Sequence, residues 1–277
     1  MDVKRDLHIH SYYSDGDYSP EEIVDLWEKE GYEIIAITDH DGIGGSKVAH
    51  KYAKGKSIIV IPGIEFDSED ELGDDIHILG YNIDFDNPKL VKTLSEVNGH
   101  RARRNDEMVK KLNELGYDIS TDDLVDIIEQ SFIGKITFAK ALINKGYATS
   151  KADAFKKILS LPEIKNMPKT VLKSKEVIAL IHEAGGFAVL AHPMEQYKSG
   201  EDTQEFYKRM SVFLNKFVEY GIDGVECKHP SANDAEEMAL RQFAARNNIG
   251  ATTGSDYHGP EQREFKGKDI RTGKCVF

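Results

Sequence analysis

The stretch Ile34–Asp41 (IIAITDHD) runs from four apolar residues directly into a charged cluster. A short, unbroken apolar run of this kind is typical of a strand that is buried on both faces, as in a parallel sheet. Charged groups at the end of such a strand are costly to bury, so their presence needs a reason. Capping of the next helix by Asp39 or Asp41 is the ordinary reason, and metal ligation by His40 is the alternative.

The same alternation of strand and helix extends to both sides of this stretch. Strands are expected at 6–10, 34–38, 58–65, 75–84, 187–191, 223–227 and 249–254, and amphipathic helices at 20–30, 46–54, 174–184, 205–220 and 233–247. Alternating strands and helices predict an α/β fold with a parallel sheet. Seven strands interrupted by one insertion favour a closed or nearly closed barrel, and a doubly wound open sheet is the alternative.

Residues 88–168 have a different pattern, with helical periodicity and little strand signal. Helices are expected at 91–116, 122–130, 137–145 and 151–159, and Pro162 and Pro168 close the region. We therefore predict three parts: the first part of the barrel at 1–87, an inserted all-helical subdomain at 88–168, and the second part of the barrel at 169–277. The insert is expected to cover the substrate side of the barrel.

Composition limits the partners and the location of the protein. The net charge of the 277 residues is −12, which argues against duplex DNA as a partner but allows a small anionic substrate at a locally positive site. Two cysteines exclude a disulfide framework and a cysteine-rich zinc module. Without an apolar run of 18 residues or an apolar leader, we expect a cytoplasmic protein with no membrane contact and no obligate protein partner.

Histidines and carboxylates recur where the predicted strands end. His8 and His10 lie two residues apart and so share one face of the first strand. Taken singly, His77 would be a core histidine and Asp15 a turn residue. In an α/β barrel, however, groups at the carboxyl ends of the strands meet at one mouth. The set exceeds the four ligands of a structural zinc site and suits two or three hydrolytic metals bridged by Glu65; its members are His8, His10, Asp15, His40, Glu65, His77, His192, Asp256 and His258.

Basic residues gather near the start of the helical region. Three arginines lie within 101–104, and Arg101 and Arg104 are spaced to share a helix face. Together with Lys135 they could bind a phosphate group; a solvated helix face with acidic partners is the alternative. His229 follows the sixth strand and could contact the substrate at the same mouth.

These stretches together resemble the PHP family, named for polymerase and histidinol phosphatase. The matching stretches are DLHIHS (6–11), SDG (14–16), ITDHD (37–41), GIE (63–65), IHILGY (76–81), LAHP (190–193) and GSDYHG (254–259). Their order and spacing agree over nearly the whole chain. The resemblance implies a distorted (β/α)7 barrel with a trinuclear centre that holds Mn²⁺, Fe²⁺ or Zn²⁺.

The resemblance also implies how the ligands are shared among the metals. One metal would be held by His8, His10, Glu65 and Asp256, a second by Glu65, His77 and His192, and a third by Asp15, His40 and His258.

The helical insert and the stretch DGVE (223–226) resemble one bacterial branch of this family. That branch includes nucleoside 3′,5′-bisphosphate phosphatases and 5′-3′ exoribonucleases that act on short RNA. Its insert usually reads Gly-Arg-Pro-His, whereas this chain reads Gly-Lys-Ile-Thr at 134–137. Lys135 therefore keeps a positive charge but lacks the bidentate fork of arginine.

The expected reaction is hydrolysis of a phosphomonoester by a metal-bound hydroxide, without a covalent intermediate. Glu65 and Asp256 would be essential as metal ligands, and His229 or a metal-bound water would protonate the leaving oxygen. The substrate would be a nucleoside 3′,5′-bisphosphate or short 5′-phosphorylated RNA. The alternatives are a histidinol-phosphate or other small-molecule phosphatase, an amidohydrolase, and a non-catalytic metal-stabilised binding domain. No convincing bridging lysine supports the amidohydrolase.

Overall fold

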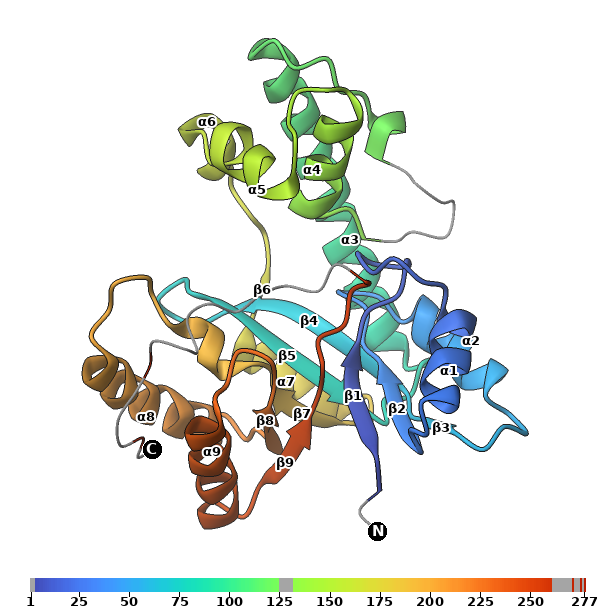
Figure 1. The fold of residues 1–277 in the computed structure, drawn as a ribbon, viewed down its shortest axis with the longest axis vertical. Helices are drawn as coiled ribbons and strands as arrows, with labels where there is room; N and C mark the ends of the chain where they lie inside the picture. The colour runs from blue at the N-terminus through green and yellow to red at the C-terminus, as the bar shows by residue number, and fades with distance from the viewer. Residues whose placement is uncertain (1–2, 125–131, 261–270, 272–274, 276) are drawn as a thin grey trace.

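A computed structural model describes residues 3–124, 132–260, 271, 275 and 277 (Figure 1). The strands form two sheets, with the orders β1-β2-β3 and β6-β4-β5-β7-β8-β9. The first sheet contains β1 (Arg5–Ile9), β2 (Ile34–Ile37) and β3 (Ile59–Val60). The second contains β4 (Gly63–Glu69), β5 (Asp75–Tyr81), β6 (Leu172–Lys173), β7 (Phe187–Leu190), β8 (Gly224–Lys228) and β9 (Gly250–Thr253).

Two isolated parallel bridges connect the sheets. Ile9, at the end of β1, pairs with Tyr257 beyond β9, and His40, beyond β2, pairs with Glu65 on β4. The α/β class is thus confirmed. The strand pairing gives two bridged sheets rather than one continuous barrel.

The prediction of a parallel sheet is wrong for two strand pairs. β4 pairs with β5 along its whole length in the antiparallel direction, and the second half of β5 pairs with β7 in the antiparallel direction as well. The cause lies in the turn at 70–74, where the Asp70 carboxylate accepts hydrogen bonds from the amides of Leu72 and Asp74. This short turn returns the chain as a hairpin, without the crossover helix that a parallel pair requires. The expected strand 58–65 is also divided, because Pro62 separates β3 from β4.

The helices around the sheets follow the sequence pattern closely. They are α1 (Pro20–Lys29), α2 (Gly44–Tyr52), α7 (Ser174–Glu183), α8 (Thr203–Glu219) and α9 (Asp234–Arg246). α1 begins with a capping box in which Ser19 and Glu22 satisfy each other's backbone amides. It buries Ile23 and Trp27 against β1 and β2 in one hydrophobic cluster.

The helical region extends beyond the end of the sheets (Figure 1). It comprises α3 (Pro88–Glu114), the 3-10 turn Thr121–Leu124, α4 (Lys135–Asn144), α5 (Lys151–Ala154), the π turn Phe155–Leu159 and α6 (Pro162–Lys165). Only the start of the expected helix 122–130 lies within the described residues, as that 3-10 turn. α3 contributes Leu90 and Leu94 to the core of the larger sheet, and Met108 and Leu112 to a separate helical core. The exact domain boundaries stay a prediction.

Within the part of the chain that the structure describes, no helix is both long enough and apolar enough to cross a membrane.

Candidate metal centre

Glu65 is the centre of a buried group of ionisable side chains. Its carboxylate is 1% exposed, and five histidine nitrogens lie 3.0–3.3 Å from its two oxygens. They belong to His8 on β1, His10 directly after β1, His40 after β2, His77 on β5 and His192 after β7. We call the nine predicted ligands the donor cluster; these five histidines and Glu65 are joined in it by Asp15, Asp256 and His258.

The structure brings His8, His10, Glu65 and Asp256 together, with ligand atoms within 4.8 Å of one another. One Asp256 oxygen lies 3.3 Å from the Nε2 atoms of both His8 and His10. The extended chain of β1 alternates its side chains, so His8 and the residue directly after the strand, His10, point to one face. Asp256 has a positive φ of 51°, and the preceding Ser255 anchors this turn by donating backbone and hydroxyl hydrogen bonds to Asp6.

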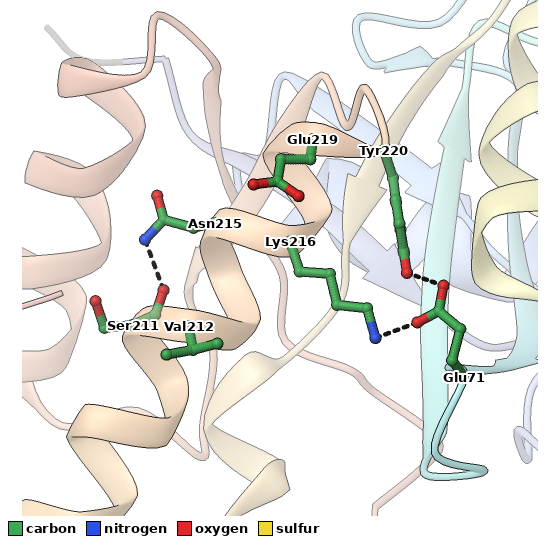
Figure 2. A pocket seen from close by; sticks show the side chains of 7 residues that line it. All are labelled: Glu71, Ser211, Val212, Asn215, Lys216, Glu219 and Tyr220. Carbon is green, nitrogen blue, oxygen red and sulfur yellow. Dashed lines mark hydrogen bonds and ion pairs between the residues drawn. The ribbon is translucent and has the colours of Figure 1, made fainter.

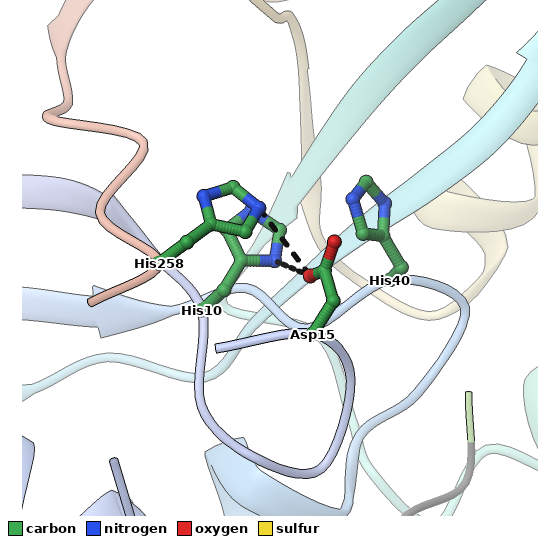
Figure 3. A group of neighbouring side chains, drawn as sticks. All are labelled: His10, Asp15, His40 and His258. Atoms are coloured by element: carbon green, nitrogen blue, oxygen red, sulfur yellow. Dashed lines mark ion pairs between the residues drawn. The ribbon is translucent and has the colours of Figure 1, made fainter. Parts of the chain in front are cut away.

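The remaining predicted ligands form two further groups. Glu65, His77 and His192 make one, and His10, Asp15, His40 and His258 make the other (Figure 3). In Figure 3, one Asp15 oxygen faces both His258 Nε2 at 3.3 Å and His10 Nδ1 at 3.6 Å. All nine predicted ligands therefore lie in one cluster, and His10 borders two of its groups.

The donor cluster fits divalent cations. Several of its buried atoms have no hydrogen-bond partner among the described residues, namely His8 Nε2, His10 Nε2, His40 Nδ1, Asp15 Oδ1, Glu65 Oε2 and His258 Nε2. Each buried polar atom left in this way costs about 1–3 kcal/mol. The separations between paired donor atoms suit ligands that share an ion at about 2.0–2.2 Å.

Charge compensation inside the cluster is reflected in the pKa values. Burial acts to lower the pKa of His10, but Asp256 and Glu65 outweigh it and raise this pKa to about 10. Likewise, burial acts to raise the pKa of Glu65, but the surrounding histidines, His8 foremost, hold it well below its usual range. His10 thus balances the neighbouring carboxylates by retaining a proton, a role that a bound metal ion would take over.

Glu226 on β8 is a buried residue beside the donor cluster that the sequence reasoning did not include among the candidate site residues. Its buried carboxylate accepts hydrogen bonds from His8 Nδ1 at 3.1 Å and from the His192 amide at 2.9 Å. Gly254 leaves room for it, because a Cβ there would lie 2.3 Å from Glu226 Oε1 and 2.2 Å from His8 Cβ. A carboxylate within the apolar strand 223–227 was the signal that could have identified it.

Neither acidic neighbour of His40 caps the next helix, so the ordinary explanation offered for this charged cluster is wrong. The N-cap of α2 is Ile43, without a side-chain hydrogen bond. Asp39 instead accepts hydrogen bonds from the Ser11 amide and hydroxyl, both at 2.8 Å. Asp41 forms an ion pair with Arg101. Both carboxylates therefore fix segments that surround the donor cluster.

Arg101, Arg104 and Lys135 lie close together but differ in their partners. Arg101 is paired with Asp41 and Asp67, and its guanidinium lies over the Phe132 ring at 4.0 Å. The Nε atom of Arg104 is buried without a hydrogen-bond partner in the described part of the chain. Burial, and then the neighbouring Arg101, lower its pKa; burial, and then Arg104, lower that of Lys135. These are the signs of a concentrated positive charge beside the donor cluster.

Phe132 joins the helical region to the donor cluster. Its ring stacks on His40 with the centroids 5.0 Å apart, and its amide donates a hydrogen bond to the carbonyl of Tyr13. A small cleft nearby is lined by Arg101, Arg104 and Lys169 among others.

His229 faces the same centre, as expected. Its Nε2 atom lies 3.5 Å from an Asp256 oxygen, and its Nδ1 atom accepts a hydrogen bond from the Ser231 amide at 3.0 Å. Because Nδ1 is an acceptor, the neutral ring carries its proton on Nε2. That proton points toward the donor cluster.

A pocket of about 580 Å³ on α8 is a different kind of site (Figure 2). Lys216 and Tyr220 there both contact Glu71, and the described residues that line the pocket include no histidine. Because its main charges are paired with each other, this pocket does not compete with the donor cluster as a candidate catalytic site.

Comparison with known proteins agrees with this geometry. The PHP domain family matches residues 6–224. The 5′-3′ exoribonuclease of Haemophilus influenzae is 30% identical over 94% of this chain and 92% of its own. The 3′,5′-nucleoside bisphosphate phosphatase of Chromobacterium violaceum is 29% identical over 96% of this chain and 90% of its own.

A structure from Bifidobacterium adolescentis, described as a metal-dependent phosphoesterase, superimposes with a TM-score of 0.79 at 27% identity. It covers 95% of this chain and 91% of its own. The family match spans more than half of the chain. The sequence motifs quoted above supply the residues of the donor cluster that the structure assembles. The chain therefore belongs to the PHP family and is a phosphoesterase hydrolase of that family.

Proposed function

We propose that this protein hydrolyses a phosphomonoester of a nucleotide, either a nucleoside 3′,5′-bisphosphate or short 5′-phosphorylated RNA. The observation that carries the proposal is the contact between the donor cluster and Arg101, Arg104 and Lys135, which we call the positive group. Asp67 lies 3.1 Å from His40 Nδ1 and 3.5 Å from Arg101 Nη1, so the two regions are in contact. A substrate with two anionic groups would match a site of this composition.

The donor cluster would hold two or three divalent ions, with Mn²⁺, Fe²⁺ and Zn²⁺ as the candidates. We assign one ion to His8, His10, Glu65 and Asp256, a second to Glu65, His77 and His192, and a third to Asp15, His40 and His258. Such ions activate water and neutralise charge on phosphate oxygens.

The chain's own residues complete the mechanism. His229 holds a proton on Nε2 beside Asp256 and is the candidate hydrogen-bond donor to the leaving oxygen. Arg104 and Lys135 would bind the second anionic group. Arg101 is held by two carboxylates, so its role would be to position the neighbouring groups.

The test is phosphate release in the presence of Mn²⁺ from adenosine 3′,5′-bisphosphate, 5′-phosphorylated RNA oligomers and histidinol phosphate. Preferred turnover of the bisphosphate, or stepwise shortening of the oligomers, is the expected result. The Lys135→Ala variant should raise KM for the preferred substrate about tenfold or more, since it removes a charge-assisted contact of about 1.5–3 kcal/mol.

Lys145→Ala is the matched control. Lys145 lies just beyond the end of α4, is paired with Asp123, and its loss should leave KM unchanged. Turnover of histidinol phosphate alone would contradict the nucleotide assignment. If the metal-loaded protein released no phosphate from any of these substrates, that result would favour a role in binding.

A further inference from the structure

Asp67 is an acidic residue of β4 that none of the three ligand sets includes. It lies two residues after Glu65, so both side chains project from the same face of the strand. In the register of the hairpin, it lies directly opposite His77 on β5. The residue is only 8% exposed. Its carboxylate is therefore directed into the centre by the strand geometry itself.

One oxygen of this carboxylate faces the donor cluster. Oδ1 lies 3.1 Å from His40 Nδ1 and 3.6 Å from His77 Nε2, and the three residues offer ligand atoms within 4.8 Å of one another. Oδ1 and His40 Nδ1 are both buried without a hydrogen-bond partner among the described residues. Two imidazoles and one carboxylate at these separations form a ligand set suited to a divalent transition metal ion.

The other oxygen faces the positive group. Oδ2 lies 3.5 Å from Arg101 Nη1 and 3.9 Å from Lys169 Nζ. The Asp67 amide donates a hydrogen bond at 3.1 Å to Asp41, the second carboxylate that holds Arg101. The Asp67 carboxylate thus has one side toward metal ligands and the other toward cations.

We propose that Asp67 is a further metal ligand, acting through Oδ1 together with His40 and His77, while Oδ2 positions Arg101 beside the bound ion. This inference rests on the metal centre of the proposed function. It adds a ligand set that shares His40 with the group of Asp15 and His77 with the group of His192. Metal occupancy and the placement of Arg101 are then linked through one side chain.

The experiment compares Mn²⁺ binding by the unaltered protein, Asp67→Asn and Asp75→Asn, each stripped of metal and titrated calorimetrically, with bound metal counted by mass spectrometry. Asp75 is the matched control, because it is the first residue of β5 in the same hairpin and pairs with Lys169 but lies outside the donor cluster. Asp67→Asn should lose one bound ion or bind its weakest ion at least tenfold less tightly. Asp75→Asn should match the unaltered protein.

A second variant tests directly whether the side chain at position 67 contacts the bound metal ion. Asp67→Cys places a thiol where the carboxylate lies, so Cd²⁺ should produce a thiolate-to-cadmium charge-transfer band that neither the unaltered protein nor Asp75→Cys shows. Equal Mn²⁺ affinity and stoichiometry in Asp67→Asn and the unaltered protein, or no such band in folded Asp67→Cys, would overturn the assignment of Asp67 alone. Failure of the unaltered protein to bind Mn²⁺ would overturn the metal centre as well.

Discussion

Glu226→Gln tests how the protein fixes the ligand orientation of His8. The Glu226 carboxylate accepts hydrogen bonds from both His8 Nδ1 and the His192 amide. A glutamine side chain has only one oxygen. If that oxygen accepts from the His192 amide, the NH2 group faces His8 Nδ1, which must then become an acceptor. The His8 proton moves to Nε2, the nitrogen that lies 3.3 Å from both Glu65 and Asp256.

A protonated Nε2 cannot bind a metal, so the variant should lose affinity without losing a ligand. Removal of the group that orients a metal-binding histidine typically costs 10–100-fold in affinity, which corresponds to about 1.4–2.7 kcal/mol. We therefore expect Glu226→Gln to weaken binding of the tightest Mn²⁺ ion by that factor. Competition with a chromogenic chelator at pH 7.5 measures the change.

Glu236→Gln is the matched control, because Glu236 is also a buried glutamate but contacts Arg271 and Tyr207 instead of a histidine. It should lower the melting temperature and leave Mn²⁺ affinity unchanged. If Glu226→Gln binds Mn²⁺ within twofold of the unaltered protein, the tautomer argument is refuted. The same conclusion follows if Glu236→Gln loses as much affinity as Glu226→Gln, because general destabilisation would then explain both.

Three further predictions follow from the same structure. Gly254→Ala should weaken Mn²⁺ binding at least tenfold because its Cβ would overlap His8 and Glu226. Gly250→Ala, at the start of β9 and with 3.4 Å to its nearest atom, should bind Mn²⁺ normally, and equal binding by the two variants would contradict this. Burial raises the pKa of both Cys227 and Cys275 to about 12. At pH 8, Ellman's reagent should therefore react rapidly with these thiols only after denaturation. A rapid reaction of the native protein would contradict this prediction by showing that the thiols are exposed. The pKa of metal-free His10 is about 10, so at neutral pH Mn²⁺ must displace its proton. Mn²⁺ affinity should therefore rise from pH 6.5 to 8.5, with measurable proton release on binding. Mn²⁺ affinity that does not change with pH would contradict the protonated state of His10.

Much of the fold could be predicted because local signals and tertiary packing agree. The helices of the sheet region lie close to their predicted ranges, as the capping residue Ser19 and the amphipathic pattern of α1 indicate. The hairpin of β4 and β5 could not be predicted from apolar periodicity. A buried strand has the same pattern whether its neighbour is parallel or antiparallel, and the direction here depends on the hydrogen bonds of Asp70 in a short turn.

The donor cluster could be assembled from strand ends because parallel and bridged strands bring those ends together. Asp67 was missed because the strand was expected to end at Glu65, whereas β4 continues to Glu69. Glu226 was noticed in a motif, but only the structure shows that it faces His8. The pairing of Arg101 with two acidic residues depends on contacts between distant segments, which no local pattern encodes.

The donor cluster joins the two ends of the chain in space. His8 and His10 are synthesised first, and Asp256 and His258 follow about 250 residues later, which takes on the order of ten seconds to a minute at typical rates of translation. The ligand set of His8 and His10 is therefore incomplete until almost the whole chain has been made. Loading of the ion at His8 and His10 would therefore report that synthesis is nearly finished, and a product of early termination would remain without its full complement of ions.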